Sequence, residues 1–142
     1  VQVQITTLTL GGTSIQTGPI ARKENSATRT FYYFSALLRS SGELSEFELN
    51  KRVAGTGTTL GNNTTDFVAN DTLKVRVDGD QISGFVNGAL SVGPVTDTAI
   101  SGFTRGGIEI VTSASGSPNA TLDNWAAADY VTTSGALRRR AF

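Results

Sequence analysis

The sequence contains no cysteine, no histidine and no methionine among its 142 residues. Without cysteine the chain has neither a disulfide framework nor a thiolate nucleophile. Without histidine it has no Ser-His-Asp triad and no imidazole ligand for a metal ion. Any acid–base chemistry therefore falls to aspartate, glutamate, lysine or tyrosine. The chain begins at Val1 rather than at methionine, so we expect it to be processed or to be part of a longer polypeptide.

Excess charge and long apolar runs are absent as well. Lysine plus arginine and aspartate plus glutamate each number 12, so the net charge is zero. A neutral chain lacks the broad electrostatic attraction that draws a protein to nucleic acid. No apolar run approaches the roughly 20 residues that cross a bilayer, and no signal peptide is recognisable. We therefore expect no nucleic-acid partner and no membrane insertion.

Short segments with period-two alternation or continuous apolar character follow one another, with turn residues between them. They predict about nine strands and one all-β, antiparallel domain, a sandwich or barrel. The predicted strands cover residues 1–5, 18–23, 29–39, 44–53, 72–79, 81–88, a following strand that reaches Val92, 106–112 and 120–125.

Residues 73–92 predict a three-stranded meander. Asp78-Gly79-Asp80 and Asn87-Gly88 are turn sequences, because Asp, Asn and Gly tolerate a positive φ. Side chains that alternate along a strand point to opposite faces. The residues predicted to face inward are Leu73, Val75, Val77, Ile82 and Val86.

Six segments, in this order, carry a resemblance to a known family: "GPIAR" at 18–22, "YYF" at 32–34, "FELNK" at 47–51, "LKVRVDGDQISGFVNG" at 73–88, "GGIEI" at 106–110 and "LDNW" at 122–125. Together they resemble the concanavalin A-like lectin/glucanase superfamily, in its laminin-G-like bacterial and phage branch. The resemblance covers residues 1–130 and implies a jelly roll of two packed sheets, one of them concave. The family's first strand or two are absent here, so we expect something to cover the sheet edge they leave.

The outward face of the meander is the predicted ligand-binding patch. With the turn centred on Gly79-Asp80, Arg76 lies opposite Ser83 and Lys74 lies opposite Phe85. A ring beside two cations and a hydroxyl is a platform on which a sugar can stack. The alternative is that Lys74 lays its methylenes over Phe85 and the hairpin is only scaffold.

Other aromatic residues are less suited to ligand binding. Tyr32 and Tyr33 lie on a strand that is apolar on both faces, which favours packing over sugar stacking. The family resemblance implies that Trp125, in "LDNW", packs in the core.

The strand at residues 44–53 carries a candidate catalytic pattern. Laminarinase-type members of the family place three acids at alternate positions of one strand. Glu46 and Glu48 match the first two, but Asn50 stands at the third and cannot protonate a leaving group. The alternative is a solvated face on which the glutamates lie beside Arg and Lys partners. The strand is predicted to turn Phe47, Leu49 and Val53 inward.

No cofactor is predicted, with calcium as an alternative. Asp78 and Asp80 flank a glycine, and Asp66, Asn70 and Asp71 lie close together in the sequence. Calcium takes six to eight oxygen ligands. The same residue types are the expected turn formers, so both interpretations stay open.

The tail at residues 131–142 is predicted to be separate from the domain. Arg138, Arg139 and Arg140 form a short basic run, and Phe142 ends the chain. The tail is either solvated or a peg that docks on an acidic partner, with Phe142 as its apolar anchor.

These features predict a non-catalytic, lectin-like module of a larger virion or cell-surface assembly, of the phage tail or capsid type, that binds glycans. One alternative is a structural or decoration protein that uses the sandwich as a scaffold among neighbouring subunits. In either case we expect the chain to be part of a larger assembly or a homo-oligomer. A glycoside hydrolase relative is disfavoured by Asn50. The expected location is a virion surface or the extracellular space.

Overall fold

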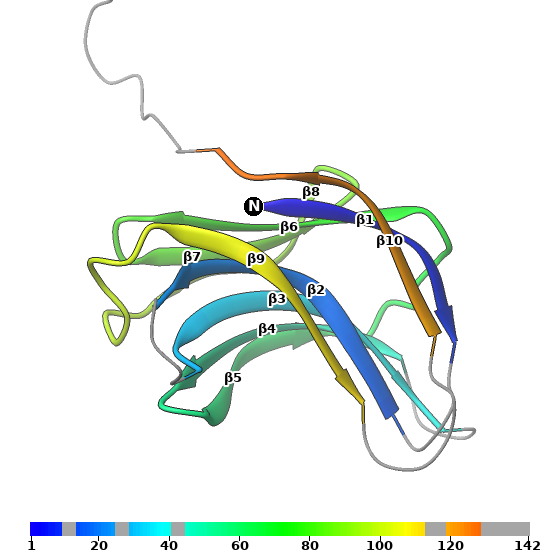
Figure 1. The fold of residues 1–142 in the computed structure, drawn as a ribbon, viewed down its shortest axis with the longest axis horizontal. Coiled ribbons are helices and arrows are strands. Elements are labelled where there is room, and N and C mark those ends of the chain that lie inside the picture. The colour runs from blue at the N-terminus through cyan, green and yellow to red at the C-terminus, as the bar shows by residue number, and fades with distance from the viewer. Residues whose placement is uncertain (10–13, 25–28, 41–44, 113–118, 129–142) are drawn as a thin grey trace, which may run out of the picture.

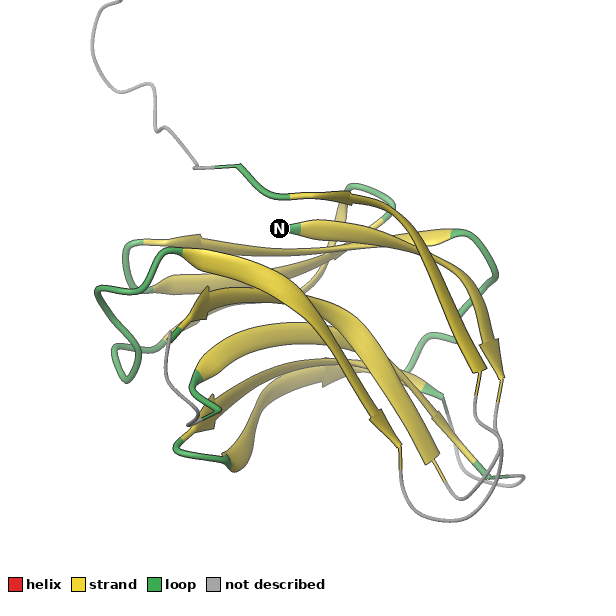
Figure 2. Ribbon diagram, viewed as in Figure 1, coloured by secondary structure: helices red, strands yellow, loops and turns green. Residues whose placement is uncertain are grey.

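The computed structural model describes residues 1–9, 14–24, 29–40, 45–112 and 119–128. Within these ranges the chain forms strands, turns and loops, and Figure 2 shows no helix among them. The strands are β1 (Gln2–Thr9), β2 (Ser14–Lys23), β3 (Phe31–Arg39), β4 (Glu46–Val53), β5 (Thr56–Asn63), β6 (Asp71–Asp78), β7 (Gln81–Val86), β8 (Ala89–Thr96), β9 (Arg105–Thr112) and β10 (Asn119–Ala126). This part of the chain accordingly holds no helix that is long and apolar enough to cross a membrane.

The strands form two five-stranded sheets that pack face to face (Figure 1). The first sheet has the order β10-β1-β6-β7-β8, and the second has the order β5-β4-β3-β2-β9. Neighbouring strands are antiparallel throughout both sheets. The predicted all-β antiparallel sandwich is confirmed. In Figure 1 the strands of the second sheet arch, and we call the side turned away from the first sheet the hollow face.

We expected something to cover a sheet edge near the start of the chain, and β10 covers that edge of β1 over much of its length. β1 lies inside its sheet, between β6 and β10, and pairs with β10 from Gln2 to Thr9. Its pairing with β6 ends where Val1 and Val75 exchange backbone hydrogen bonds. Within the described residues, no strand lies beside residues 76–78 of β6 on that side.

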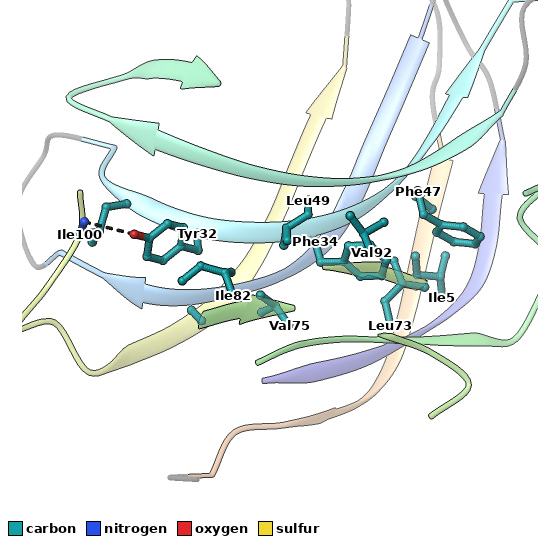
Figure 3. Packing of buried hydrophobic residues seen from close by; sticks show 12 residues of the cluster. Ile5, Tyr32, Phe34, Phe47, Leu49, Leu73, Val75, Ile82, Val92 and Ile100 are labelled. Carbon is teal, nitrogen blue, oxygen red and sulfur yellow. Dashed lines mark hydrogen bonds between the residues drawn. The ribbon is translucent and has the colours of Figure 1, made fainter. Parts of the chain in front are cut away.

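The core lies between the sheets and consists of the inward residues of the alternating strands. Phe34 on β3 and Phe47 on β4 stack with their ring centroids 6.0 Å apart. Figure 3 shows both rings among aliphatic side chains of the facing sheet. Those of the facing sheet that no solvent reaches include Ile5, Leu73, Val75 and Ile82, and Leu49 on β4 is equally buried beside the two rings. Because burial of such a side chain is worth about 1.5–3 kcal/mol, these contacts hold the two sheets together.

The predicted meander is confirmed in register and in turn chemistry. Arg76 lies opposite Ser83, and Lys74 lies opposite Phe85. A two-residue loop follows Asp78, and the next loop is Asn87-Gly88, whose φ angles of 50° and 83° are both positive. A type I′ hairpin turn requires two positive φ angles, so Asn87-Gly88 by itself favours the reversal of chain direction between β7 and β8.

The strand prediction missed one strand and made others too short, among them β1, which runs to Thr9 instead of residue 5, and β8, which runs to Thr96. β5 was missed altogether, because this edge strand carries one large apolar residue, Leu60, and so shows no alternation. β2 begins at Ser14 rather than at residue 18, since its first four residues, 14–17, are mostly polar. An edge position needs little apolar surface, so the pattern that marks central strands is absent there.

Two residues predicted to be buried are exposed. Val53 is 40% exposed at the end of β4, because the chain turns immediately afterwards through Ala54 and Gly55, both with positive φ. Trp125 is 51% exposed, which corrects the core position implied by the family resemblance. It follows Asn124, whose φ is 51°, on the edge strand β10, where the register with β1 shifts.

A polar clamp ties the connection between β8 and β9 to the second sheet. The Tyr32 hydroxyl donates to the Asp97 carboxylate at 2.7 Å, and Lys51 forms an ion pair with the same carboxylate. The backbone N–H of Ile100 donates to the Tyr32 hydroxyl (Figure 3), and Ile100 itself is fully buried. The clamp therefore closes one end of the core with a loop that has no strand partner of its own.

Candidate functional site

The predicted ligand-binding patch lies on the outer face of β6 and β7, away from the core. The ammonium of Lys74 lies 4.4 Å from the centroid of the Phe85 ring, a cation–π contact. The Arg76 guanidinium pairs with the Asp78 carboxylate at 2.8 Å. Ser83 faces the same side but is only 8% exposed, so it lies at the floor of the patch rather than at its surface. The four predicted residues are therefore brought together.

A cleft of about 320 Å³ opens at this patch. Its lining residues are Arg76, Asp78, Gln81, Ser83, Phe85, Leu90 and Pro94. Leu90 is the cross-strand neighbour of Phe85 and is 52% exposed. The cleft thus combines an apolar wall with a guanidinium, a carboxylate, an amide and a hydroxyl. This mixture suits a ligand that presents C–H faces and hydroxyl groups together.

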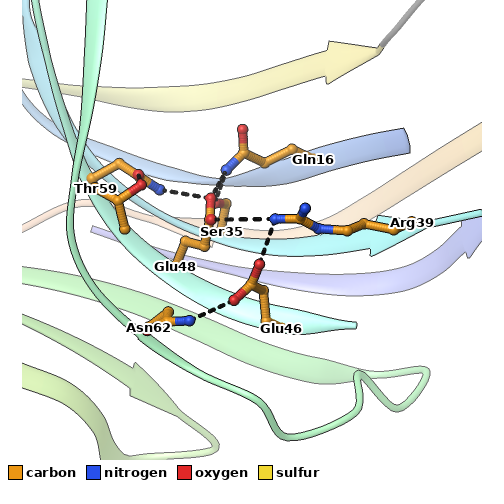
Figure 4. Close-up of polar contacts among 8 residues, drawn as sticks. Gln16, Ser35, Arg39, Glu46, Glu48, Thr59 and Asn62 are labelled. Atoms are coloured by element: carbon orange, nitrogen blue, oxygen red, sulfur yellow. Dashed lines mark hydrogen bonds and ion pairs between the residues drawn. The ribbon is translucent and has the colours of Figure 1, made fainter. Parts of the chain in front are cut away.

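The hollow face of the second sheet carries a different arrangement, a connected polar network (Figure 4). The Gln16 amide donates to Ser35 at 2.8 Å and to Glu48 at 2.9 Å. Arg39 pairs with Glu46 at 2.6 Å and lies 3.8 Å from Glu48. The glutamates therefore have an arginine partner, as the non-catalytic interpretation of this strand predicts.

Asn50 lies on the predicted face but is 3% exposed, so the expectation of a solvated strand face is wrong at this position. Its amide donates to Glu48 at 3.3 Å, and its carbonyl accepts from the Thr59 hydroxyl at 2.9 Å. Asn62 on β5 also donates to Glu46 at 2.6 Å. The third acid position of the laminarinase pattern is thus an amide held inside the network.

This network predicts that the protein does not hydrolyse β-glucans. Incubation with laminarin is expected to release no reducing sugar, because neither Asn50 nor its hydrogen-bond partner Thr59 can protonate a leaving group. A reducing-sugar assay over a long incubation checks this. Release that disappears in the variant Glu46→Gln would show that the carboxylates of the hollow face are catalytic and would overturn the prediction.

The two tyrosines are packed, as predicted. Tyr32 belongs to the polar clamp, and Tyr33 is buried on the hollow face beside Phe31, at 5.6 Å between ring centroids. The Arg52 guanidinium lies 5.8 Å from the Tyr33 ring and 3.8 Å from Glu109. Burial raises the pKa of the Tyr33 hydroxyl above its usual value, against the effect of Arg52. Neither ring offers a free surface for stacking.

Two of the residues considered for calcium, Asp71 and Asp78, use their carboxylates in local structure. The Asp71 carboxylate accepts from the backbone N–H of Val68 at 2.9 Å and from the Asn87 amide at 2.7 Å. The Asp78 carboxylate accepts from Arg76. The described residues contain no group of three or more His, Cys, Asp or Glu placed to hold a metal ion. The predicted docking tail, with Arg138, Arg139, Arg140 and Phe142, lies outside the described residues.

Comparison with known proteins supports the fold. No family model matches the chain, and no curated protein does. Among solved structures, the chain is similar to the carbohydrate-binding module CBM66 from Bacillus subtilis. The TM-score is 0.52 with 19% sequence identity, over 87% of this chain and 73% of that one. At this identity the likeness shows a shared β-sandwich fold, consistent with the predicted concanavalin A-like jelly roll.

Sequence reasoning missed part of the site. Leu90 and Pro94, both on β8, line the cleft. The sequence predicted a strand there but did not predict which face of the sheet each side chain lies on. The register of β8 against β7 shifts twice, between Ile82 and Gly84 and again before Phe85. A shift of one residue exchanges inward and outward positions, so simple alternation does not predict this wall.

Proposed function

We propose that this protein is a non-catalytic, glycan-binding β-sandwich module of the concanavalin A-like superfamily. The observation that carries the proposal is the cleft beside Phe85, where an aromatic ring and apolar walls adjoin Arg76, Asp78 and Gln81. Aromatic rings take the C–H face of a sugar, and charged and amide groups take its hydroxyls. The fold shared with a carbohydrate-binding module supports the same proposal.

Lys74 is part of this proposed site. Its contact with Phe85 is made by the ammonium, 4.4 Å from the ring centroid, so the charge stays at the patch. An ammonium held there bonds sugar hydroxyls while the ring supplies the apolar surface. We therefore propose Lys74, Arg76, Ser83 and Phe85 as the binding residues of the patch.

The hollow face is the other surface with polar groups for a glycan. Its donors and acceptors already bond one another, as Gln16 does to Glu48 and Asn62 does to Glu46. A sugar bound there has to replace these hydrogen bonds, with little net gain for each exchange. At the patch on β6 and β7, Arg76 pairs with Asp78 and Gln81 donates to Thr96, but Phe85 and the exposed Leu90 add apolar surface that a sugar can cover without replacing hydrogen bonds. We therefore place the glycan there.

We further propose that the module belongs to a larger virion or cell-surface assembly, outside the cell or on the virion surface. The support is the sequence of the tail at 131–142, whose three arginines and final Phe142 suit an acidic partner surface. A protein that uses the sandwich only as a scaffold among neighbouring subunits is the alternative, and it predicts no glycan binding by the patch.

The variant Phe85→Ala is expected to lose retention on immobilised neutral polysaccharides such as laminarin, xylan and dextran by about tenfold or more, since the stacking surface is gone. Its unfolding free energy should change by about 1 kcal/mol or less, because the side chain lies on the outer face. Affinity electrophoresis and denaturant unfolding measure the two effects.

Asn62→Ala is the matched control, because it removes one exposed amide from the hollow face. We expect its retention to equal that of the unchanged protein. Loss of retention in Asn62→Ala alone would place the sugar on the hollow face. Destabilisation of Phe85→Ala by about 3 kcal/mol or more would show that the ring is part of the core and the hairpin is scaffold.

A further inference from the structure

A second and larger cleft, of about 570 Å³, lies beside the patch. It opens at the N-terminal end of β1, where β6 continues beyond its pairing with β1. The C-terminal end of β2 and the start of β9 form its other sides. Four cationic residues line it: Arg22, Lys74, Arg76 and Arg105. Its described lining contains no aspartate and no glutamate. In a chain with zero net charge, this is a local concentration of positive charge.

Three of the four cations lack a carboxylate partner in the described part of the chain. The Arg22 guanidinium donates to the backbone carbonyls of Ile100 and Gly79, at 2.9 and 2.5 Å, which fixes its position without neutralising it. The Lys74 ammonium lies over the Phe85 ring, which does not neutralise its charge. Arg105, at the start of β9, is exposed. The fourth, Arg76, pairs with Asp78.

The main chain adds neutral hydrogen-bonding groups to the same cleft. Val75 uses both its N–H and its C=O on the β1 side, toward Val1. Because backbone groups alternate sides along a strand, those of Val77 point the same way. Among the described residues no strand lies beside Val77 there, and its neighbour Phe103 supplies an apolar wall. An oxyanion in the cleft therefore meets guanidinium groups together with the Val77 N–H, which has no strand partner among the described residues.

We infer that this cleft binds an anionic sugar residue, one that carries a carboxylate or a sulfate group. The inference rests on the proposed function, because Arg76 lines both clefts and Lys74 lines the cationic cleft while its ammonium contacts the Phe85 ring. A single glycan can therefore span from the Phe85 ring into the cationic cleft. The module then discriminates among glycans by charge. Neutral sugars use the patch alone, and acidic ones gain the additional contacts with Arg22 and Arg105.

The test compares polygalacturonate with its methyl ester, which has the same backbone without the charge. We expect the protein to bind polygalacturonate about tenfold more tightly at low salt, as for a ligand with charge-assisted hydrogen bonds. The preference should shrink at high salt, where the Debye length falls to about 3 Å. Dextran sulfate against dextran is the parallel arm, and it separates sulfate from carboxylate as the preferred group.

Arg105→Gln is the decisive variant, because Arg105 lies outside the neutral patch. It should abolish most of the preference for the acid form and leave retention on neutral laminarin unchanged. Arg29→Gln is the control: it removes an equally exposed guanidinium, 2.6 Å from Glu109, that does not line the cleft. We expect Arg29→Gln to keep the preference.

Three results would overturn the inference. Equal binding of polygalacturonate and its ester, with laminarin still retained, would refute the anionic site and leave the proposed function intact. Equal losses in Arg105→Gln and Arg29→Gln would show nonspecific attraction. Displacement of polygalacturonate by single-stranded DNA at matched charge, dependent on Arg105, would assign the cleft to nucleic acid instead of a glycan.

Discussion

Replacing Asp97 with alanine is expected to lower the unfolding free energy by about 3 kcal/mol, as for the loss of one partner from a largely buried ion pair. The carboxylate holds Lys51, accepts from Tyr32 and accepts from the backbone N–H of Ala99 at 2.9 Å. The variant leaves the Lys51 ammonium without its partner and frees the loop that carries buried Ile100. Chemical denaturation at neutral pH measures the effect.

The pH dependence of stability separates the charge of Asp97 from its packing. Burial alone raises the pKa of the Asp97 carboxyl, but hydrogen bonds from Lys51 and Tyr32 outweigh it and hold the pKa below its usual value. A lowered pKa stabilises the folded state above the unfolded-state pKa of about 3.9, and the contribution is lost as the pH falls through the folded-state pKa. The difference in unfolding free energy between the unchanged protein and the variant Asp97→Asn should therefore become smaller below about pH 4.

Tyr32 gives the opposite dependence at high pH. Burial and the hydrogen bond to Asp97 raise its pKa to about 12. A raised pKa means that the stabilisation is present below the unfolded-state value of about 10 and is lost as the pH rises toward the folded-state value. Tyr32→Phe should lack this alkaline loss. An alkaline stability profile equal for the two proteins would show that the hydroxyl does not titrate with unfolding.

Replacing Gly84 with alanine is expected to lower the unfolding free energy by about 2 kcal/mol, within the range of overpacked cores. Gly84 is buried at the centre of β7, opposite Val75 on β6 and Val92 on β8. A Cβ built there would overlap the ring of Phe34, which stacks on Phe47 and has no room to retreat. Thermal or denaturant unfolding of the variant checks this.

Gly57→Ala on β5 is the control for Gly84. A Cβ at Gly57 meets nothing within 4 Å, so its effect on stability should stay within about 0.5 kcal/mol. Equal effects of the two substitutions would mean that a general preference of strands for alanine over glycine, rather than the contact with Phe34, decides the outcome at Gly84.

The part of the candidate site that could be predicted from the sequence is the part formed by the β6–β7 hairpin. The Asp78 to Gln81 turn sets the register of β6 and β7, so the neighbours of Lys74 and Arg76 followed by counting along the sequence. That register depends on local turn chemistry and on which residues are apolar, both of which the sequence states directly. The pairing of Arg76 with Asp78, two positions apart on one face, follows from the same counting.

The cationic cleft shows why the rest could not be predicted. Arg22 and Arg105 stand 83 positions apart in the sequence, and each reaches the cleft because β2 and β9 pair with a register shift near that end. Nothing local to either residue marks it as part of a site. Likewise Glu46 and Glu48 could be placed on one face, but their partners on β2, β3 and β5 required the order of the whole sheet.

The sequence by itself determined that this protein is all-β and antiparallel with a specified meander at residues 73–92, because alternation and turn residues act over a few neighbouring positions. The choice of a sandwich over a barrel came from the family resemblance and from the structure. The tertiary structure decided which polar residues meet. Asn50 became buried, Trp125 became exposed and β10 came to cover β1 through contacts between segments far apart in the sequence. Period-two alternation assigns a residue to one of two faces, but what lies opposite that face depends on how the two sheets stack.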